Sequence, residues 1–533
     1  MHILANGLSM GAGIFLVLAI GLALSFEFVN GFHDTANAVA TVIYTHTLPP
    51  WVAVIWSGCW NLIGVLVSTG AVAFGILALL PVELVVNIGS ATGFAMVFAL
   101  LISAILWNLG TWYLGLPASS SHTLIGSIMG VGLANSMLSK GHVFGEGVNW
   151  HKATEVFTSL LVSPLVGFIG SALLLLVMKA VIRKPALYAA PATDTPPPLP
   201  IRALLVLTCT GVSFAHGSND GQKGMGLMLL ILIGILPGAY ALNMGASPAD
   251  VHKLATSAYS VSAALDAHAT GVPMTDSEAP AELSSYLKTS GVVTNRTYAA
   301  LALMNHRIAT ELTGKQTFND FNETQVKAVR TDIYLVSGTI GKLKSQKLIT
   351  DPAEEKALSS YKDGLTSATQ YIPFWVKVAV ALALGLGTMI GWKRIVTTVG
   401  EKIGKEHLTY AQGASAELIA MLTIGAADMF GLPVSTTHVL SSGVAGTMAA
   451  NRSGLQMNTL RNLMLAWVLT LPVCIILGAG TFAAGLFLIF TSPIGKILFV
   501  AGLIVLCLIV WQLWRRFTAH VRDESPVKLA KAA

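Results

Sequence analysis

Five polar side chains recur at steps of three and four residues along an otherwise apolar run that begins near Ile14: Glu27, Asn30, Asp34, Asn37 and Thr41. On a helix this spacing places them on one face, which His33 borders. A carboxylate at the bilayer centre costs roughly 2.5–3.5 kcal/mol on insertion scales, so the face should point into a protein interior or a wet cavity. We interpret it as part of an ion or substrate pathway. The alternative is that these groups only join helices by hydrogen bonds.

A second polar stretch closes an apolar run in the second half of the chain. Its polar residues again follow helical spacing, and they are Ser213, His216, Asn219, Asp220 and Lys223. This stretch is similar to the one around Asp34, which indicates an internal repeat.

A clearer repeat is Gly115-Leu-Pro-Ala-Ser-Ser-Ser-His-Thr123, which returns as Gly431-Leu-Pro-Val-Ser-Thr-Thr-His-Val439. The Gly permits a turn, the Pro suits the first helical position, and the hydroxyls then lie in the first turn. Free backbone N–H groups and the positive end of the helix dipole favour an anion there. The alternative is that the hydroxyls only cap their own helices. Two matched copies favour a substrate site built from both halves.

The composition indicates a polytopic membrane protein, because 54% of the residues are hydrophobic and only 11% are charged. Besides the Asp34 helix, apolar runs occur near residues 51–80, 92–114, 156–178, 201–236, 372–391, 414–427, 461–490 and 494–514. Each is near or above the length that spans a bilayer. Gly and Pro interrupt several of them, so we expect kinked or re-entrant segments.

The N-terminus lacks the basic region of a cleaved signal peptide, so we expect it to be retained. The four cysteines lie in apolar segments without metal or redox spacing, and we interpret them as packing residues. The net charge of +6 comes mainly from short basic stretches at 183–184, 393–405 and 515–531. Such stretches beside spans predict a cytoplasmic location and argue against nucleic-acid binding.

We divide the chain into six parts. Residues 1–184 form a first transmembrane repeat and 185–200 a Pro-rich linker. The second repeat begins at 201–242, is interrupted at 243–370 and continues at 371–490. The interruption is charged but keeps helical apolar spacing, so we expect a small extramembrane helical domain, with a disordered loop as the alternative. Residues 491–533 form an extra helix and a basic tail.

These motifs resemble those of the inorganic phosphate transporter (PiT) family, specifically its bacterial low-affinity branch, over about residues 10–490. The resemblance rests on Asn30-Gly-Phe-His-Asp-Thr-Ala-Asn-Ala38, on His216-Gly-Ser-Asn-Asp-Gly-Gln-Lys-Gly224 and on the two Gly-Leu-Pro elements. It implies an all-α polytopic membrane protein with two inverted repeats, paired re-entrant hairpins and about 10–12 transmembrane segments. It further implies cation-driven phosphate symport.

By motif match, the resemblance makes Asp34, Asn37, Asn219 and Asp220 candidates for cation coupling. It makes seven hydroxyl residues candidates for phosphate contact: Ser119, Ser120, Ser121, Thr123, Ser435, Thr436 and Thr437. We add Lys223, whose charge can match that of the anion. The metal ligands stay undefined.

One departure from the family pattern concerns the coupling ion. The signature often reads Asn-Asp in both halves, whereas the first half here reads His33-Asp34. Imidazole is a poor ligand for a hard cation but titrates near neutrality, so His33 joins the coupling candidates and favours protons over sodium.

We therefore expect a multi-pass inner-membrane carrier that imports inorganic phosphate by proton symport, without a resident cofactor. Phosphate travelling as a neutral divalent metal complex suits the electrostatics. Further candidate partners are arsenate and divalent metal ions, the lipid bilayer that surrounds the protein, and a second copy of the chain in a homodimer. The alternatives are a sodium-coupled symporter and an anion channel. A membrane phosphoesterase, the enzyme alternative, would need a positioned nucleophile and base that we do not find in the motifs.

Overall fold

The computed structural model describes residues 10–491 except 35, 80–89, 139–143, 146–147, 192–194, 270 and 289–290, together with residue 512. Its named elements are all helices, apart from one isolated bridge between Gly404 and Leu455. The expectation of an all-helical membrane protein is confirmed by this architecture. The proposed helix at 494–514 and the basic tail lie outside the described residues except for residue 512.

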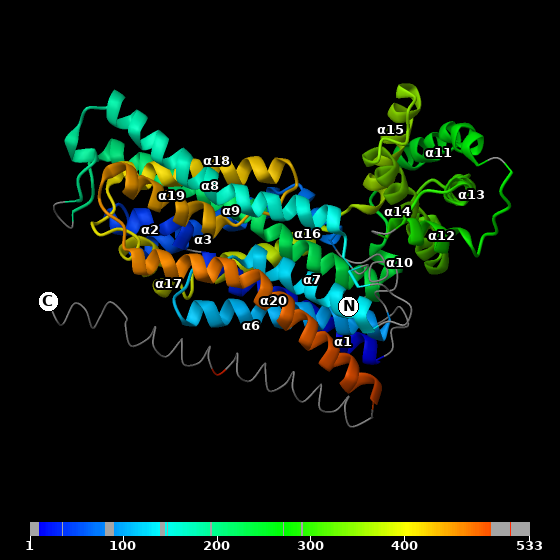
Figure 1. The fold of residues 1–533 in the computed structure, drawn as a ribbon, viewed down its shortest axis with the longest axis horizontal. Coiled ribbons are helices and arrows are strands. Elements are labelled where there is room, and N and C mark those ends of the chain that lie inside the picture. The colour runs from blue at the N-terminus through cyan, green and yellow to red at the C-terminus, as the bar shows by residue number, and fades with distance from the viewer. Residues whose placement is uncertain are drawn as a thin grey trace.

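Among the described residues up to 235, eight helices belong to the bundle, and the last of them, α9, begins the second half. They are α1 (Met10–Asp34), α2 (Ala36–Tyr44), α3 (Pro50–Val67), α4 (Ala71–Leu77), α6 (Ala91–Tyr113), α7 (Ser120–Leu138), α8 (Trp150–Val181) and α9 (Leu199–Ile235). The bundle is completed by α16 (Phe374–Thr388), α17 (Lys393–Glu401), α18 (Tyr410–Met429), α19 (Thr436–Asn451) and α20 (Met457–Thr491). Most of these helices run along the long axis of the molecule (Figure 1).

Six of the described helical segments are long and apolar enough to cross a membrane: Met10–Tyr44, Pro50–Val67, Thr92–Tyr113, Trp150–Val181, Leu199–Ile235 and Met457–Leu488. A seventh is α16 if it is counted with α15 (Pro352–Thr369), from which it is bent by 70°. The less apolar helices α7 and α19 are almost completely buried. Long apolar helices thus surround two helices that carry the Gly-Leu-Pro motifs at their starts.

The two halves pack reciprocally. Helix α1 packs on α16 while α9 packs on α3, and α7 packs on α20 while α19 packs on α8. Matching glycines allow close approaches in two of these pairs: a Cβ on Gly31 of α1 would lie 2.3 Å from the Leu384 carbonyl oxygen, and one on Gly217 of α9 would lie 2.1 Å from that of Asn61. Gly31 and Gly217 occupy the same position in the two polar stretches. This exchange of partners is what two interleaved repeats produce.

A separate group of helices occupies one end of the molecule (Figure 1). It contains α11 (Pro248–His268), α12 (Ala279–Leu287), α13 (Asn295–Leu312), α14 (Glu323–Ser345) and α15. Apolar residues at helical spacing, such as Val329, Ile333 and Val336 on α14, form its buried face. A short helix, α10 (Pro237–Tyr240), connects this domain to the end of α9, and α15 leads into the start of α16.

The domain and the basic residues of two helices, α9 and α16 with the turn after it, lie at opposite ends of those helices. Arg202 lies in the first turn of α9, whereas the domain follows the last turn of that helix. Likewise α16 begins beside the domain, and Lys393 and Arg394 follow its far end. Because short basic loops face the cytoplasm, we predict that the domain lies on the non-cytoplasmic side.

Thiol labelling tests this orientation. Asp363 and Lys402 are both exposed, on α15 and directly after α17 respectively. In intact cells an impermeant thiol reagent is expected to label Asp363→Cys but not Lys402→Cys, and inside-out vesicles should reverse the pattern. The parent chain, with its native cysteines, is the background control. Labelling of Lys402→Cys from outside would overturn the assignment.

Candidate substrate and cation site

Asp34 lies where the first helix is interrupted, because α1 ends at this residue and α2 begins at Ala36. Its side chain is buried and accepts hydrogen bonds from both halves of the protein. Ser120 donates to Oδ2 at 3.2 Å, and Thr437 donates to Oδ1. The first polar stretch thus meets both hydroxyl motifs at the carboxylate of Asp34.

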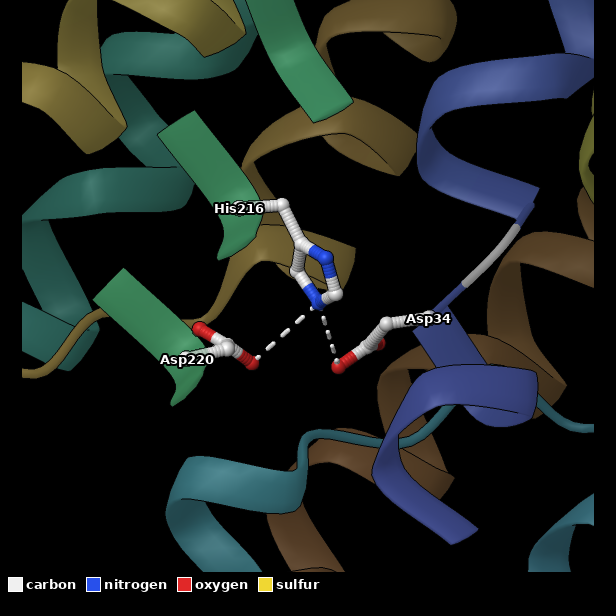
Figure 2. A group of neighbouring side chains, drawn as sticks. All are labelled: Asp34, His216 and Asp220. Carbon is white, nitrogen blue, oxygen red and sulfur yellow. Dashed lines mark ion pairs between the residues drawn. The ribbon is translucent and has the colours of Figure 1, made fainter. Parts of the chain in front are cut away.

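The second polar stretch presents three ionisable side chains to the same place. His216 Nε2 lies 3.7 Å from Asp34 Oδ2 and 3.5 Å from Asp220 Oδ2, as Figure 2 shows. Lys223 Nζ makes an ion pair with Asp220 Oδ2 at 2.6 Å and lies 3.4 Å from Ser120 Oγ. All of these side chains are buried.

The two Gly-Leu-Pro motifs meet at the starts of their helices. Ser121 of α7 donates to the Val434 carbonyl at 2.6 Å, and the rings of His122 and His438 lie 4.8 Å apart. Ser120 and Thr436 are the first residues of α7 and α19. Two helix N-termini therefore converge near Lys223, and the positive ends of their dipoles make this place suited to an anion.

The predicted hydroxyl residues divide by orientation. Ser120 and Thr437 reach the carboxylates, whereas Ser119 and Ser435 accept hydrogen bonds from the backbone N–H of His122 and His438, each at 3.2 Å. These two serines cap their own helices, as the alternative interpretation of the motif supposes. The remaining hydroxyls are Ser121, described above, Thr123, which donates to the Ser119 carbonyl at 2.8 Å, and the buried Thr436.

The coupling candidates also divide. His33 Nε2 lies 3.1 Å from Thr111 Oγ1 on α6, and Asn219 donates to the Leu432 carbonyl at 3.2 Å. Asp34 and Asp220 belong to the cluster, and the side chain of Asn37 lies outside the described residues. His216, rather than His33, is the imidazole between the carboxylates. The sequence shows His216 in the second polar stretch, but His33 is the histidine adjacent to Asp34 in the sequence and is therefore the predicted coupling residue.

Hydrogen bonding defines the protonation of His216. Thr388 donates to the Leu384 carbonyl and accepts from Asn61 Nδ2 at 3.0 Å, so the Asn61 amide oxygen faces His216 Nδ1 at 2.8 Å. His216 Nδ1 is therefore the donor, and Nε2 faces the two carboxylates. A lone pair beside two carboxylates is unfavourable, so this position favours a proton or a metal ion.

Asp34, His216 and Asp220 each offer one ligand atom, and these atoms lie within 4.8 Å of one another (Figure 2). Mixed imidazole and carboxylate donors suit a transition metal ion better than sodium. With His216 neutral, Asp34, Asp220 and Lys223 carry a net charge of −1, so an anion entering alone would meet an uncompensated negative charge. A cation that enters with it removes this penalty.

Two further carboxyl groups on α18, the buried Glu417 and the partly buried Asp428, belong to no predicted site. Asp428 accepts from Ser218 Oγ at 2.6 Å and from Gln222 Nε2 at 2.5 Å, and Glu417 accepts from Thr208 Oγ1 at 2.6 Å. Both lie within the apolar run expected near 414–427 or directly after it. An ionisable residue within an apolar span is the signal that would have identified them.

Known proteins are similar in sequence to this chain over most of its length. Residues 30–478 match the phosphate transporter family. The chain is 40% identical over 504 residues to the low-affinity inorganic phosphate transporter PitA of Escherichia coli strain K12, covering 90% of this chain and 98% of that protein. It is 40% identical over 503 residues to PitB of the same strain, covering 91% and 99%.

More distant matches extend the comparison. The probable low-affinity inorganic phosphate transporter of Bacillus subtilis strain 168 is 27% identical over 467 residues, covering 87% of this chain and 96% of that protein. A solved structure, the sodium-dependent phosphate transporter, aligns at 18% identity with a TM-score of 0.47, covering 88% of this chain and 98% of that chain. Because the family match and the 40% identity both span most of the sequence, the chain belongs to the phosphate transporter family.

Proposed function

We propose that this protein is a low-affinity carrier that imports inorganic phosphate across the inner membrane by proton symport. Family membership and relatives named as low-affinity inorganic phosphate transporters support phosphate as the substrate. The observation that carries the proposal is the convergence of both hydroxyl motifs on Asp34, Asp220 and Lys223. An anion site and a cation site therefore share side chains, which suits a symporter.

Phosphate would lie between the starts of α7 and α19. Backbone N–H groups would donate to its oxygens, Ser120 would exchange its hydrogen bond to Asp34 for one to the phosphate, and Lys223 would exchange part of its ion pair with Asp220 for the phosphate. The weakened ion pair leaves the charge of Asp220 partly uncompensated. A proton or a divalent metal ion beside Asp34, His216 and Asp220 restores the balance, and a metal travelling with phosphate would then be part of the substrate.

Counterflow in proteoliposomes tests this proposal. Unlabelled phosphate inside should accelerate uptake of labelled phosphate by a carrier, whereas a channel shows no such acceleration. An imposed inward proton gradient should drive accumulation without sodium. Accumulation that requires sodium would replace proton coupling by the sodium alternative, and labelled divalent metal in the same assay shows whether metal moves with phosphate.

Ser120 and Thr437 give a sharper test of the site. Each donates to Asp34 from a different repeat, and a hydrogen bond to a charged group contributes about 1.5–3 kcal/mol. We expect Ser120→Ala and Thr437→Ala each to reduce phosphate uptake about tenfold or more, with normal amounts of protein in the membrane. Uptake of labelled phosphate, normalised to inserted protein, measures the effect.

The matched control is Ser127→Ala. Ser127 lies on α7, is buried like Ser120, but donates only to the Thr123 carbonyl within its own helix at 2.9 Å. Its replacement should leave uptake within about twofold of the parent protein, the margin that a change of roughly 0.4 kcal/mol gives. Equal losses in all three variants would count against a specific role of Ser120 and Thr437.

A further inference from the structure

Glu27 is a buried carboxyl group outside the cluster described above. It lies on α1 seven residues before Asp34, which corresponds to about 10 Å along a helix, and its relative exposure is 0%. Oε2 accepts a hydrogen bond from Asn30 Nδ2 at 3.3 Å. Among the described residues, Oε1 of Glu27 and Oδ1 of Asn30 have no hydrogen-bond partner. Both orphan atoms are acceptors, so a proton on Glu27 would supply the donor that this pair lacks.

The neighbouring helix leaves room for this side chain through a glycine. A Cβ on Gly224 of α9 would lie 2.1 Å from Glu27 Cγ and 2.8 Å from its Oε1. Gly224 directly follows Lys223, so the backbone that positions the lysine also contacts the glutamate. A movement of α9 that accompanies phosphate binding would therefore change the surroundings of Glu27.

Among the described residues, the charged groups that interact electrostatically with Glu27 lie on α9: Lys223, Asp220 and His216. Lys223 is already paired with Asp220, and His216 lies between the two aspartates. Helix α6, which also packs on α1, contains no charged residue or histidine, and Lys377 of α16 donates to the Ser68 carbonyl at 2.7 Å. Within the described part of the chain, the ion pairs of Lys223 and His216 go to Asp220 and Asp34 and not to Glu27.

A buried carboxyl group without its own cation is most stable as the neutral acid. Asp34 differs, because Ser120 and Thr437 both donate to it and a carboxylate accepts these bonds best. The two acidic residues of the first polar stretch are therefore suited to different tasks. One is built to stay an anion, and the other is built to bind and release a proton.

We propose that Glu27 carries the coupled proton through the transport cycle, an inference that rests on the proton symport proposed above. On the outer side its O–H bond forms with a proton from water. On the inner side this bond breaks, the proton leaves to cytoplasmic water, and the carboxylate remains until the next cycle. Phosphate is held by other residues and undergoes no covalent change.

The test is Glu27→Gln in the full-length protein in proteoliposomes. Glutamine keeps the size of the side chain and an oxygen that accepts from Asn30, but it cannot release a proton. Phosphate accumulation driven by an imposed pH gradient is expected to fall to the level without a gradient. Counterflow exchange at equal pH on both sides should stay within a factor of two of the exchange rate of the parent protein.

Two variants accompany it. Glu27→Asp retains a carboxyl group and is expected to retain gradient-driven accumulation with an altered pH profile, so it carries the test if Glu27→Gln is not inserted. Ser25→Ala, on the same helix at a position whose hydroxyl donates only to the Gly21 carbonyl, should behave as the parent protein.

The results separate the two proposals. Full gradient-driven accumulation by Glu27→Gln, with a parent protein that is proton-driven, would overturn the role of Glu27 alone. Equal loss of accumulation and exchange in normally inserted Glu27→Gln would also overturn it, because that result indicates a role in phosphate binding or packing. A parent protein that shows no response to the pH gradient would overturn proton symport itself and this inference with it.

Discussion

Asp34→Asn is expected to abolish both phosphate accumulation and phosphate exchange. Asp34 accepts hydrogen bonds from Ser120 and Thr437, one from each repeat, and faces His216. The substitution removes the negative charge and places an amide NH₂ opposite one of these two donors. One hydrogen bond to a charged group, worth about 1.5–3 kcal/mol, is lost, and the other is weakened because its acceptor becomes neutral, which together correspond to a reduction on the order of a hundredfold or more. Proteoliposome uptake and counterflow, normalised to inserted protein, measure it.

The contrast with Glu27→Gln makes this prediction informative, because that variant should lose accumulation and keep exchange. Asp363→Asn is a matched control for the chemical change, since Asp363 is exposed on α15 of the separate domain. It should transport phosphate at the parent rate. A transport rate of Asp34→Asn within a few-fold of the parent rate would show that Asp34 is not part of the site. Loss of the inserted protein would instead assign it a role in joining helices.

Gly31→Leu and Gly217→Leu are expected to prevent stable assembly of the two repeats. A first side-chain atom on Gly31 would already lie 2.3 Å from the Leu384 carbonyl oxygen, and one on Gly217 would lie 2.1 Å from that of Asn61. These contacts are with backbone, so α16 or α3 would have to move. Overpacking typically costs about 1–3 kcal/mol, and displacing a packed helix adds to this cost. The sum is a large part of the free energy of unfolding of a native protein, which is only about 5–15 kcal/mol.

Thermal stability in detergent, measured as the fraction of protein that elutes as a single species after heating, tests this prediction. The control is Gly21→Leu on α1, where no atom lies within 4 Å of the added Cβ. This variant should have the melting temperature of the parent protein or a slightly higher one, because leucine favours a helix more than glycine does. Parent-like stability of Gly217→Leu would contradict the close packing of α9 on α3.

The sequence by itself determined the class, the repeats and the family. Spanning helices follow from uninterrupted apolar runs, and the helices α8, α9 and α20 cover the runs predicted near 156–178, 201–236 and 461–490. These features are local, because the bilayer length and the backbone hydrogen bonds constrain each segment separately. The two Gly-Leu-Pro motifs likewise specify a turn and a helix start without reference to the remaining chain.

Only the tertiary structure decided which side chains face the shared site. Ser119, Ser120 and Ser121 are consecutive, yet one caps its helix, one reaches Asp34 and one donates to Val434. Consecutive residues on a helix point about 100° apart, so a run of similar hydroxyls carries no signal for which of them will face the partner. The direction of the partner is set by distant segments, since Asp34 lies 86 residues from Ser120 and Val434 lies 313 residues from Ser121.

The same reason explains the histidines. His33 adjoins Asp34 in the sequence but lies against Thr111, whereas His216, from the other repeat, lies between Asp34 and Asp220. Helix α9 reaches this position because Gly217 and Gly64 let it approach α3 closely. Sequence periodicity specifies the polar face of each helix, but which faces meet depends on the packing of both repeats, and the distances between charges that govern cation binding arise only there.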